Sequence, residues 1–199
     1  MNAEHIAHII TDLKDTDLNL RNKLIRKGKL SDGYDSAMEE LHNCNAKILN
    51  DLIDQIGYPT EDKVGKEASE AAWLVIQHAI GQPAFMRKCR ELLQKAVDEN
   101  KAAPINLAYL SDRIAVFEEQ PQLYGTQFDW DENGELTPNP FDDLTRVNQR
   151  RKAIGLNTLE DQIAMIRKRT KEENQLPPKD LEKRKRDVEE WKKKVGWIR

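Results

Sequence analysis

Residues 35–56 read DSAMEELHNCNAKILNDLIDQI. Apolar side chains recur here at spacings of three and four, at Met38, Leu41, Cys44, Ile48, Leu52 and Ile56. That period places them on one face of an α-helix. The next residues, Gly57-Tyr58-Pro59-Thr60, predict the end of the helix, because proline cannot continue one. The stretch therefore predicts an amphipathic helix with one buried face.

Further helices are predicted on both sides of this one. Residues 3–27 indicate one or two amphipathic helices that end at Lys27-Gly28-Lys29. Residues 64–80 are apolar all round in their second half, which is typical of a central, buried helix. Proline in the first turn favours two more helices, one over 83–99 and one that starts at Pro104.

The period changes after the Pro104 helix. Residues 122–128 predict an extended segment, with Gln122, Tyr124 and Thr126 on one face. Leu123, Gly125 and Gln127 then lie on the other face. Asn133-Gly134 favours a tight hairpin turn, and Pro138 and Pro140 would end the return strand. A short β-hairpin insertion near 122–138 is therefore expected.

Two helices follow, near 142–153 and 158–173, and Thr158 with Asp161 forms an approximate capping box. Pro177-Pro178 predicts a hinge before a charged helix. The fold class is thus mainly α, a helical bundle with one hairpin. We expect a single domain over residues 1–176 and a C-terminal helix over 177–199. Trp191 and Trp197 favour packing of that helix on the body, over exchange with a second subunit or free movement.

Composition restricts the function classes. Of 199 residues, 34% are charged and 38% hydrophobic, which excludes disorder throughout. The net charge of -3 hides an asymmetry, because residues 145–199 carry 17 Lys and Arg against 9 Asp and Glu. A basic tail folded back on an acidic body explains this, as does an acidic partner. Acidic residues interleaved within 179–194 dilute the positive field, so we do not expect nucleic acid as a partner.

The cellular location is predicted from three features that the sequence lacks. Cys44 and Cys89 show neither a disulfide framework nor a zinc spacing. The first residues do not have the form of a signal peptide. The longest apolar runs are too short to span a membrane. We therefore expect a cytoplasmic protein without a membrane partner.

The histidines are candidates for chemistry. Gln77 and His78 follow four apolar residues in the predicted buried helix. His78 is either a general acid or base, or a core histidine bound to a neighbouring group. His5, His8 and His42 are interpreted as surface residues. His5 and His8 are three apart, but no third ligand accompanies them, so we expect neither a metal nor a cofactor.

Two basic groups could bind an anion. Tyr109, Asp112 and Arg113 share a flank of the Pro104 helix, and the planar fork of Arg113 suits an anion. A structural Asp–Arg pair is the alternative. Arg146 and Arg150, four apart, could hold a phosphate or carboxylate on one helix face, or serve as exposed charge.

Four ordered blocks carry a resemblance: WLVIQHA at 73–79, NLAYLSDR at 106–113, QLYGTQ at 122–127 and VNQRRKAIGL at 147–156. With them the chain resembles an uncharacterised bacterial family of unknown function, over about residues 55–165. In that family an aspartate often follows the Gln-His-Ala block, and here Ile80 takes its place. The resemblance implies no activity.

The resemblance does imply one shared site. We expect a metal-independent enzyme in which His78, Tyr124 and Arg113 are catalytic. Its substrate-binding residues would be Gln77, Tyr109, Asp112, Gln122, Thr126, Gln127 and Arg150. A small polar, anionic or amide substrate would undergo hydrolysis, transfer or cyclisation. No Ser/His/Asp signature, phosphate loop or dinucleotide fingerprint is present.

A different class of function stays open. The acidic body and basic tail also suit a non-catalytic module that binds a small ligand, a peptide or a protein partner, or a homo-oligomer. Alanine at His78 would leave the activity of such a module intact, whereas reversal of surface charge would abolish it.

Overall fold

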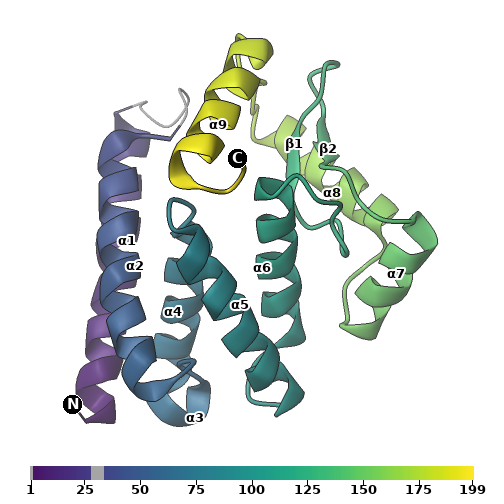
Figure 1. The fold of residues 1–199 in the computed structure, drawn as a ribbon. Helices are drawn as coiled ribbons and strands as arrows, with labels where there is room; N and C mark the ends of the chain where they lie inside the picture. The colour runs from purple at the N-terminus through teal and green to yellow at the C-terminus, as the bar shows by residue number, and fades with distance from the viewer. Residues whose placement is uncertain (1, 28–33) are drawn as a thin grey trace. The chain divides into compact units, whose positions relative to one another are not determined.

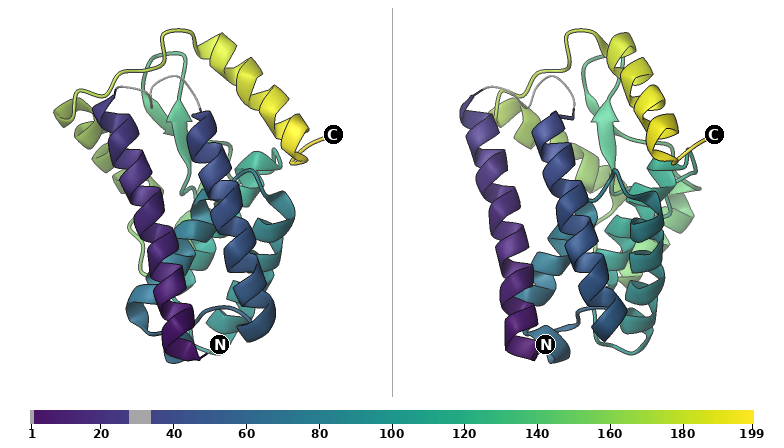
Figure 2. Two further views of the ribbon diagram at one scale, coloured as in Figure 1. Left: turned by 90° about the vertical axis from the view of Figure 1, so that its left-hand side faces the viewer. Right: turned by 60° about the vertical axis from the view of Figure 1, so that its left-hand side comes forward.

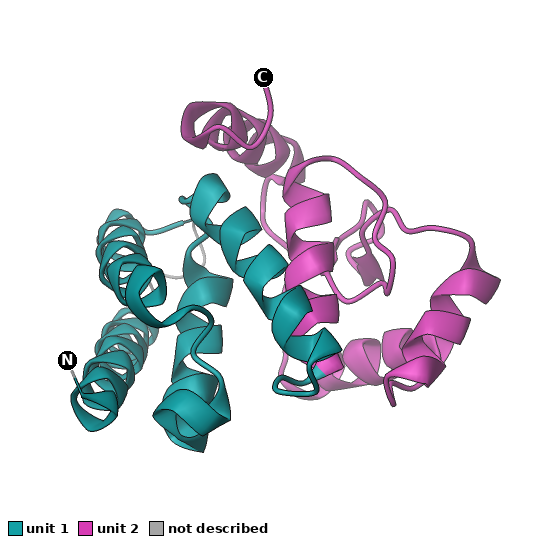
Figure 3. Cartoon of the chain, turned by 60° about the horizontal axis from the view of Figure 1, so that its bottom comes forward, with its two compact units in different colours: residues 1–103 teal, residues 104–199 magenta. Residues whose placement is uncertain are grey.

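The computed structural model describes residues 2–27 and 34–199. Within these ranges it contains nine α-helices and one two-stranded antiparallel sheet (Figure 1), which confirms the predicted fold class. Contacts divide the chain into unit 1, residues 1–103, and unit 2, residues 104–199 (Figure 3). The predicted domain boundary between residues 176 and 177 stays a prediction, and the two units are described separately.

Unit 1 consists of helices. They are α1 (Ala3–Arg26), α2 (Ser36–Ile56), α3 (Glu61–Val64), α4 (Lys66–His78) and α5 (Pro83–Asp98). Figure 2 shows α1 and α2 side by side and antiparallel. Helix α4 packs against α1, α2 and α5, so it is central, as its apolar sequence predicted. The predicted end of the first helix at Gly28 lies outside the described residues.

The ends of α2 follow from local chemistry. The Asp35 carboxylate accepts the backbone N–H groups of Ala37, at 2.9 Å, and Met38, and so satisfies amides that lack a partner within the helix. At the other end Gly57 has φ +73°, a conformation that glycine adopts without steric cost. Inside the unit, Asn45 Nδ2 donates to the Leu13 carbonyl at 3.1 Å and ties α2 to α1.

Two details of the predicted helices differ in unit 1. The helix predicted over 64–80 begins at Lys66 and ends at His78. Residues 61–64 form the separate short helix α3, because Gly65 between them has φ +79° and interrupts the helical backbone.

Unit 2 contains the hairpin. Its elements are α6 (Pro104–Phe117), β1 (Phe128–Trp130), β2 (Leu136–Pro138), α7 (Leu144–Ala153), α8 (Leu159–Glu172) and α9 (Leu181–Val195). The strands pair Phe128 with Pro138 and Trp130 with Leu136, around a turn that contains Asn133-Gly134. The predicted cap of α8 is also confirmed, because Thr158 Oγ1 accepts the Asp161 N–H at 3.2 Å.

The predicted extended segment over 122–128 is wrong for most of its length. The strand starts only at Phe128, and residues 120–127 form an irregular loop, here called the 120–127 loop. Gln122 makes one isolated bridge with Phe141. The alternation of side chains therefore fails: Gln122 and Gly125 are buried and Leu123 is exposed. The loop curls because its amides turn toward a buried carboxylate, which is described below.

Helix α9 packs on α6 through aromatic rings, as the tryptophans predicted. The Phe117 ring stacks on Trp197 at 5.1 Å between centroids and lies 5.7 Å from Trp191. Lys192 Nζ lies 2.7 Å from Glu119 Oε1, and Arg184 reaches Asp129 of β1 at 2.7 Å. These contacts make α9 part of unit 2.

Gly125→Ala is expected to destabilise the protein by about 1–3 kcal/mol. Gly125 has φ +64°, and an added Cβ would lie 2.9 Å from Cδ1 of Leu159, which is fully buried. Gly155→Ala is the matched control, because Gly155 has φ +80° but nothing within 4 Å of its added Cβ. Urea unfolding should show a larger loss of unfolding free energy for Gly125→Ala than for Gly155→Ala. Equal losses would mean that the contact of the added Cβ with Leu159 does not destabilise the protein.

Candidate functional site

The side chain of His78, at the end of α4, contacts a buried carboxylate. Its Nδ1 lies 2.8 Å from Oδ2 of Asp17, which α1 contributes. Asp17 is fully buried. A carboxylate in such a place is costly unless hydrogen bonds and opposite charge compensate it. The pair is therefore a specific arrangement of the core of unit 1.

A second imidazole contacts the same oxygen. His42 of α2 places Nε2 at 3.1 Å from Asp17 Oδ2, and its ring centroid lies 5.1 Å from that of His78. On the far side of the ring, His42 Nδ1 lies 2.6 Å from Oη of Tyr34. Three helices thus bring together Asp17, His42 and His78, here called the histidine cluster.

Burial differs within the histidine cluster. The side chains of Asp17 and His42 are 1% and 8% exposed, whereas that of His78 is 29% exposed. Burial alone would raise the pKa of Asp17, but the two imidazoles more than offset this and hold that pKa below its ordinary value. Asp17 is therefore an anion near neutral pH, and His78 is the member of the cluster that a solute reaches.

In the described part of the chain, two polar atoms of the histidine cluster are buried without a well-aligned hydrogen bond. They are Asp17 Oδ1 and His42 Nε2. The 3.1 Å approach of His42 Nε2 to Asp17 Oδ2 is an electrostatic contact, not a directed bond. One donor atom from each residue lies within 4.8 Å of the others, a spacing that could hold a metal ion.

In unit 2 the predicted site residues form a hydrogen-bond network around Asp112. The Asp112 carboxylate accepts the backbone N–H groups of Leu123 at 2.8 Å and Thr126 at 2.9 Å, and that of Tyr124 at 3.2 Å. Burial raises the pKa of Asp112, and these backbone bonds oppose the rise. The alternative predicted for Asp112, a structural pair with an arginine, does not account for these contacts, because backbone amides of the loop surround the carboxylate.

Amide side chains complete the network. Gln122 is buried and donates Nε2 to the carbonyls of Gln127 and Asn139, while its Oε1 accepts the Gln127 N–H at 2.7 Å. The Gln127 side chain accepts from Nε of Arg113 at 3.2 Å and donates to Thr126 Oγ1. The structure thus brings five predicted residues together: Arg113, Asp112, Gln122, Thr126 and Gln127. All five bond to one another or to the backbone of the 120–127 loop, which makes them determinants of its shape.

Helix α7 holds the same loop from its other side. Arg150 donates to the Leu123 carbonyl at 3.2 Å and pairs with Asp142 at 2.8 Å. Arg151, which is buried, donates to the Tyr124 carbonyl at 2.8 Å. Of the remaining predicted residues, Tyr109 and Tyr124 are partly buried in unit 2, and Gln77 is buried in unit 1.

A family model described as a family of unknown function, DUF6624, matches residues 10–171. The chain belongs to this family. The predicted resemblance is therefore confirmed, and the match extends beyond the predicted range of 55–165. The curated proteins and the solved structures contain no match.

The DUF6624 match includes all three residues of the histidine cluster. Two of them, Asp17 and His42, were not among the predicted site residues. His42 was interpreted as a surface residue, which is wrong, because its side chain is 8% exposed. The predicted apolar stripe of α2 is right at Met38 and Leu52, which are buried, and wrong at Cys44 and Ile48, which are exposed. Cys44 is exposed, and the residues that face inward are Met38, His42, Asn45, Ala46, Leu49, Leu52 and Ile53.

A signal for Asp17 was present in the sequence. The buried positions of α1 are Ile6, Ile10, Leu13, Asp17 and Leu24, so Asp17 occupies a place in the apolar stripe. His42 and Asn45 do the same in α2. Polar residues at core positions of two neighbouring helices are uncommon unless they bind each other or a ligand. The aspartate that often follows the Gln-His-Ala block is replaced here by Ile80. Asp17, which lies 61 positions before His78, instead provides a carboxylate that contacts His78.

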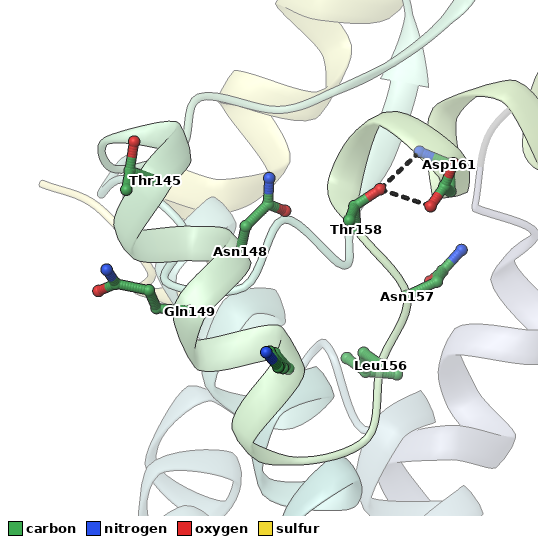
Figure 4. A pocket seen from close by; sticks show the side chains of 8 residues that line it. Thr145, Asn148, Gln149, Leu156, Asn157, Thr158 and Asp161 are labelled. Atoms are coloured by element: carbon green, nitrogen blue, oxygen red, sulfur yellow. Dashed lines mark hydrogen bonds between the residues drawn. The ribbon is translucent and has the colours of Figure 1, made fainter.

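A hollow of about 570 Å³ lies between α7 and the start of α8 in this DUF6624 chain. Figure 4 shows the side chains that line it: Thr145, Asn148, Gln149, Lys152, Leu156, Asn157, Thr158 and Asp161. Asn148 Oδ1 accepts the Leu159 N–H at 2.8 Å and so helps to hold its wall. None of these residues was among the predicted site residues.

None of the helices in the described ranges has the length and apolar character that a membrane span requires.

Proposed function

We propose that this DUF6624 chain is an enzyme that uses His78 for proton transfer on a small polar or anionic substrate, such as an amide. The observation that supports this is the 2.8 Å contact of His78 Nδ1 with the buried Asp17 carboxylate, beside a partly exposed imidazole ring. Hydrolysis, group transfer and cyclisation all need a proton to be moved in this way.

The contact determines which nitrogen reacts. An ionised carboxylate only accepts hydrogen bonds, so the nitrogen that faces Asp17 is the protonated one. The lone pair of His78 is then on Nε2. In the proposed step Nε2 takes a proton from a water molecule or a substrate hydroxyl and returns it to the leaving group. The negative charge of Asp17 stabilises the imidazolium between these events.

The proposed step involves the two side chains alone and does not require a metal ion. The roles predicted for Tyr124 and Arg113, a second proton donor and an anion-binding group, stay predictions that this step does not use. Both residues belong to unit 2, whereas His78 belongs to unit 1.

A second candidate function is ligand binding without catalysis. The hollow between α7 and α8 supports it, because its lining combines apolar surface with amide and hydroxyl groups such as Asn148, Gln149 and Thr145. This module would bind a small polar ligand in unit 2. Gln149→Ala would then weaken binding, and His78→Gln would leave it unchanged.

A cytoplasmic location is part of the proposal. Cys44 and Cys89 are both free thiols. Thiols persist in the reducing cytoplasm, whereas oxidising compartments favour disulfides.

His78→Gln is expected to lower turnover by about 10²–10⁴-fold, because glutamine can hydrogen-bond to Asp17 but cannot take up a proton. Small polar metabolites would first be screened by their effect on the melting temperature of the wild type. Compounds that raise it would then be assayed for conversion.

The control for this test is His8→Gln, which changes an exposed histidine of α1. It should retain full turnover. A His78→Gln variant that still binds a substrate and converts it at a rate within threefold of wild type would overturn the catalytic proposal.

A further inference from the structure

We propose that Asp17, His42 and His78 bind one divalent transition-metal ion, which would inhibit the proposed proton transfer at His78. The binding part of this inference does not rest on the proposed catalysis, and its test measures the ion directly. The three donor atoms come from α1, α2 and α4 and lie within 4.8 Å of one another.

Unpartnered atoms in the histidine cluster point to a ligand. Among the described residues, Asp17 Oδ1 and His42 Nε2 are buried without an aligned hydrogen bond, in side chains that are 1% and 8% exposed. Leaving such atoms unpaired in a core costs free energy. A cation bound between the carboxylate and His42 would be a partner for His42 Nε2, and a carboxylate that binds it through both oxygens would also engage Oδ1.

The spacing is close to that of a metal site. Metal–nitrogen and metal–oxygen bonds of about 2.0–2.2 Å place the ligands of a tetrahedral ion about 3.3 Å apart. In the structure, Asp17 Oδ2 lies 2.8 Å from His78 Nδ1 and 3.1 Å from His42 Nε2. Entry of an ion thus requires Asp17 Oδ2 to move away from each of these two nitrogens by about half an ångström or less.

The surroundings of His42 also fit a ligand. Its Nδ1 lies 2.6 Å from the Tyr34 hydroxyl, which leaves Nε2 directed toward the carboxylate. Imidazoles that bind metals generally use their second nitrogen for a hydrogen bond that holds the ring in place. Tyr34 is therefore a positioning residue for the metal site.

The donor set selects the class of ion. Two imidazole nitrogens and one carboxylate oxygen suit Zn²⁺, Ni²⁺ or Co²⁺ better than Mg²⁺ or Ca²⁺, which prefer oxygen ligands throughout. The partly exposed side chain of His78 provides the route from solvent.

Metal binding and proton transfer exclude each other at His78. An ion on Nδ1 displaces the proton that Nδ1 shares with Asp17 and requires the ring proton to sit on Nε2. Nε2 then has no lone pair with which to accept a proton from a substrate. The free ion would therefore act as an inhibitor in the proposed function.

The test is calorimetric titration of chelator-treated protein with ZnCl₂, NiCl₂ and MgCl₂. It uses a His8→Ala background, because exposed His5 and His8 could together bind ions weakly. We expect one Zn²⁺ per chain and no binding of Mg²⁺. His42→Ala should weaken Zn²⁺ binding by at least about 100-fold, and Tyr34→Phe by about tenfold.

A second measurement needs no change in the cluster and so does not depend on how variants fold. Paramagnetic Ni²⁺ should broaden the imidazole NMR signals of His42 and His78 in the His8→Ala protein and leave that of His5 sharp. No heat of Zn²⁺ binding, or broadening confined to His5, would overturn the inference. Because neither readout involves turnover, failure of the catalytic proposal would be recognised separately.

Discussion

Asp17→Asn is expected to lower turnover by about 10²–10⁴-fold while the helices of unit 1 stay folded. The substitution keeps the size and shape of a fully buried side chain but removes its negative charge. The amide can present its NH₂ group to His78 Nδ1, which reverses the hydrogen bond and moves the ring proton to Nε2. Nε2 then cannot act as a base, and no anion stabilises the imidazolium.

The matched control is Asp12→Asn. Asp12 is also on α1 and contacts a histidine, His8, at 3.4 Å, but both side chains are more than half exposed. Turnover and circular dichroism should be measured for both variants. Asp12→Asn should behave as wild type. If Asp17→Asn folds and keeps full turnover, the carboxylate has no part in the chemistry.

Asp112→Ala is expected to reduce the free energy of unfolding by about 3–5 kcal/mol. The carboxylate accepts backbone N–H groups from Leu123, Tyr124 and Thr126, and alanine leaves these donors without their acceptor. Asp112→Asn should cost less, because one amide oxygen remains, although the NH₂ group then faces a backbone donor. Urea unfolding followed by circular dichroism would measure both.

Asp143→Ala serves as the comparison for Asp112→Ala. Asp143 also accepts a backbone N–H, that of Arg146 at 3.0 Å, but it does so as an ordinary cap of α7. Its loss should cost about 1 kcal/mol. Similar losses for the two variants would show that Asp112 contributes no more than a helix cap does.

Most of the fold could be predicted from the sequence because its signals are local. The signals are the spacing of apolar residues by three and four in 35–56, the prolines at positions 83 and 104, and Thr158 before α8. Each signal depends only on neighbours within one or two helical turns. The Asn133-Gly134 hairpin is a local signal of the same kind.

The 120–127 loop could not be predicted in this way. Its backbone conformation depends on Asp112, which lies 11 to 14 positions earlier in the chain, and on Arg151 of α7, 27 positions after Tyr124. The residues of this segment alternate with a period of two, which predicts an extended strand. Its backbone amides instead hydrogen-bond to the buried Asp112 carboxylate, and these bonds determine its conformation.

Of the three members of the histidine cluster, only His78 was predicted as a site residue. His78 was identified because a polar residue followed four apolar ones. Its partners Asp17 and His42 became clear only in the structure, since three helices have to assemble before they meet. The predicted α2 stripe followed the apolar residues alone, so it included the exposed Cys44 and Ile48 and left the buried His42 on the surface.

The Phe117–Trp197 stack gives the molecule an intrinsic optical probe. Trp197 is almost fully buried although it lies two residues from the last position of the chain. If α9 detaches, the indole enters water and its fluorescence emission moves to longer wavelength. Docking of the C-terminal helix can therefore be followed in unlabelled protein, under any solution condition that transmits ultraviolet light.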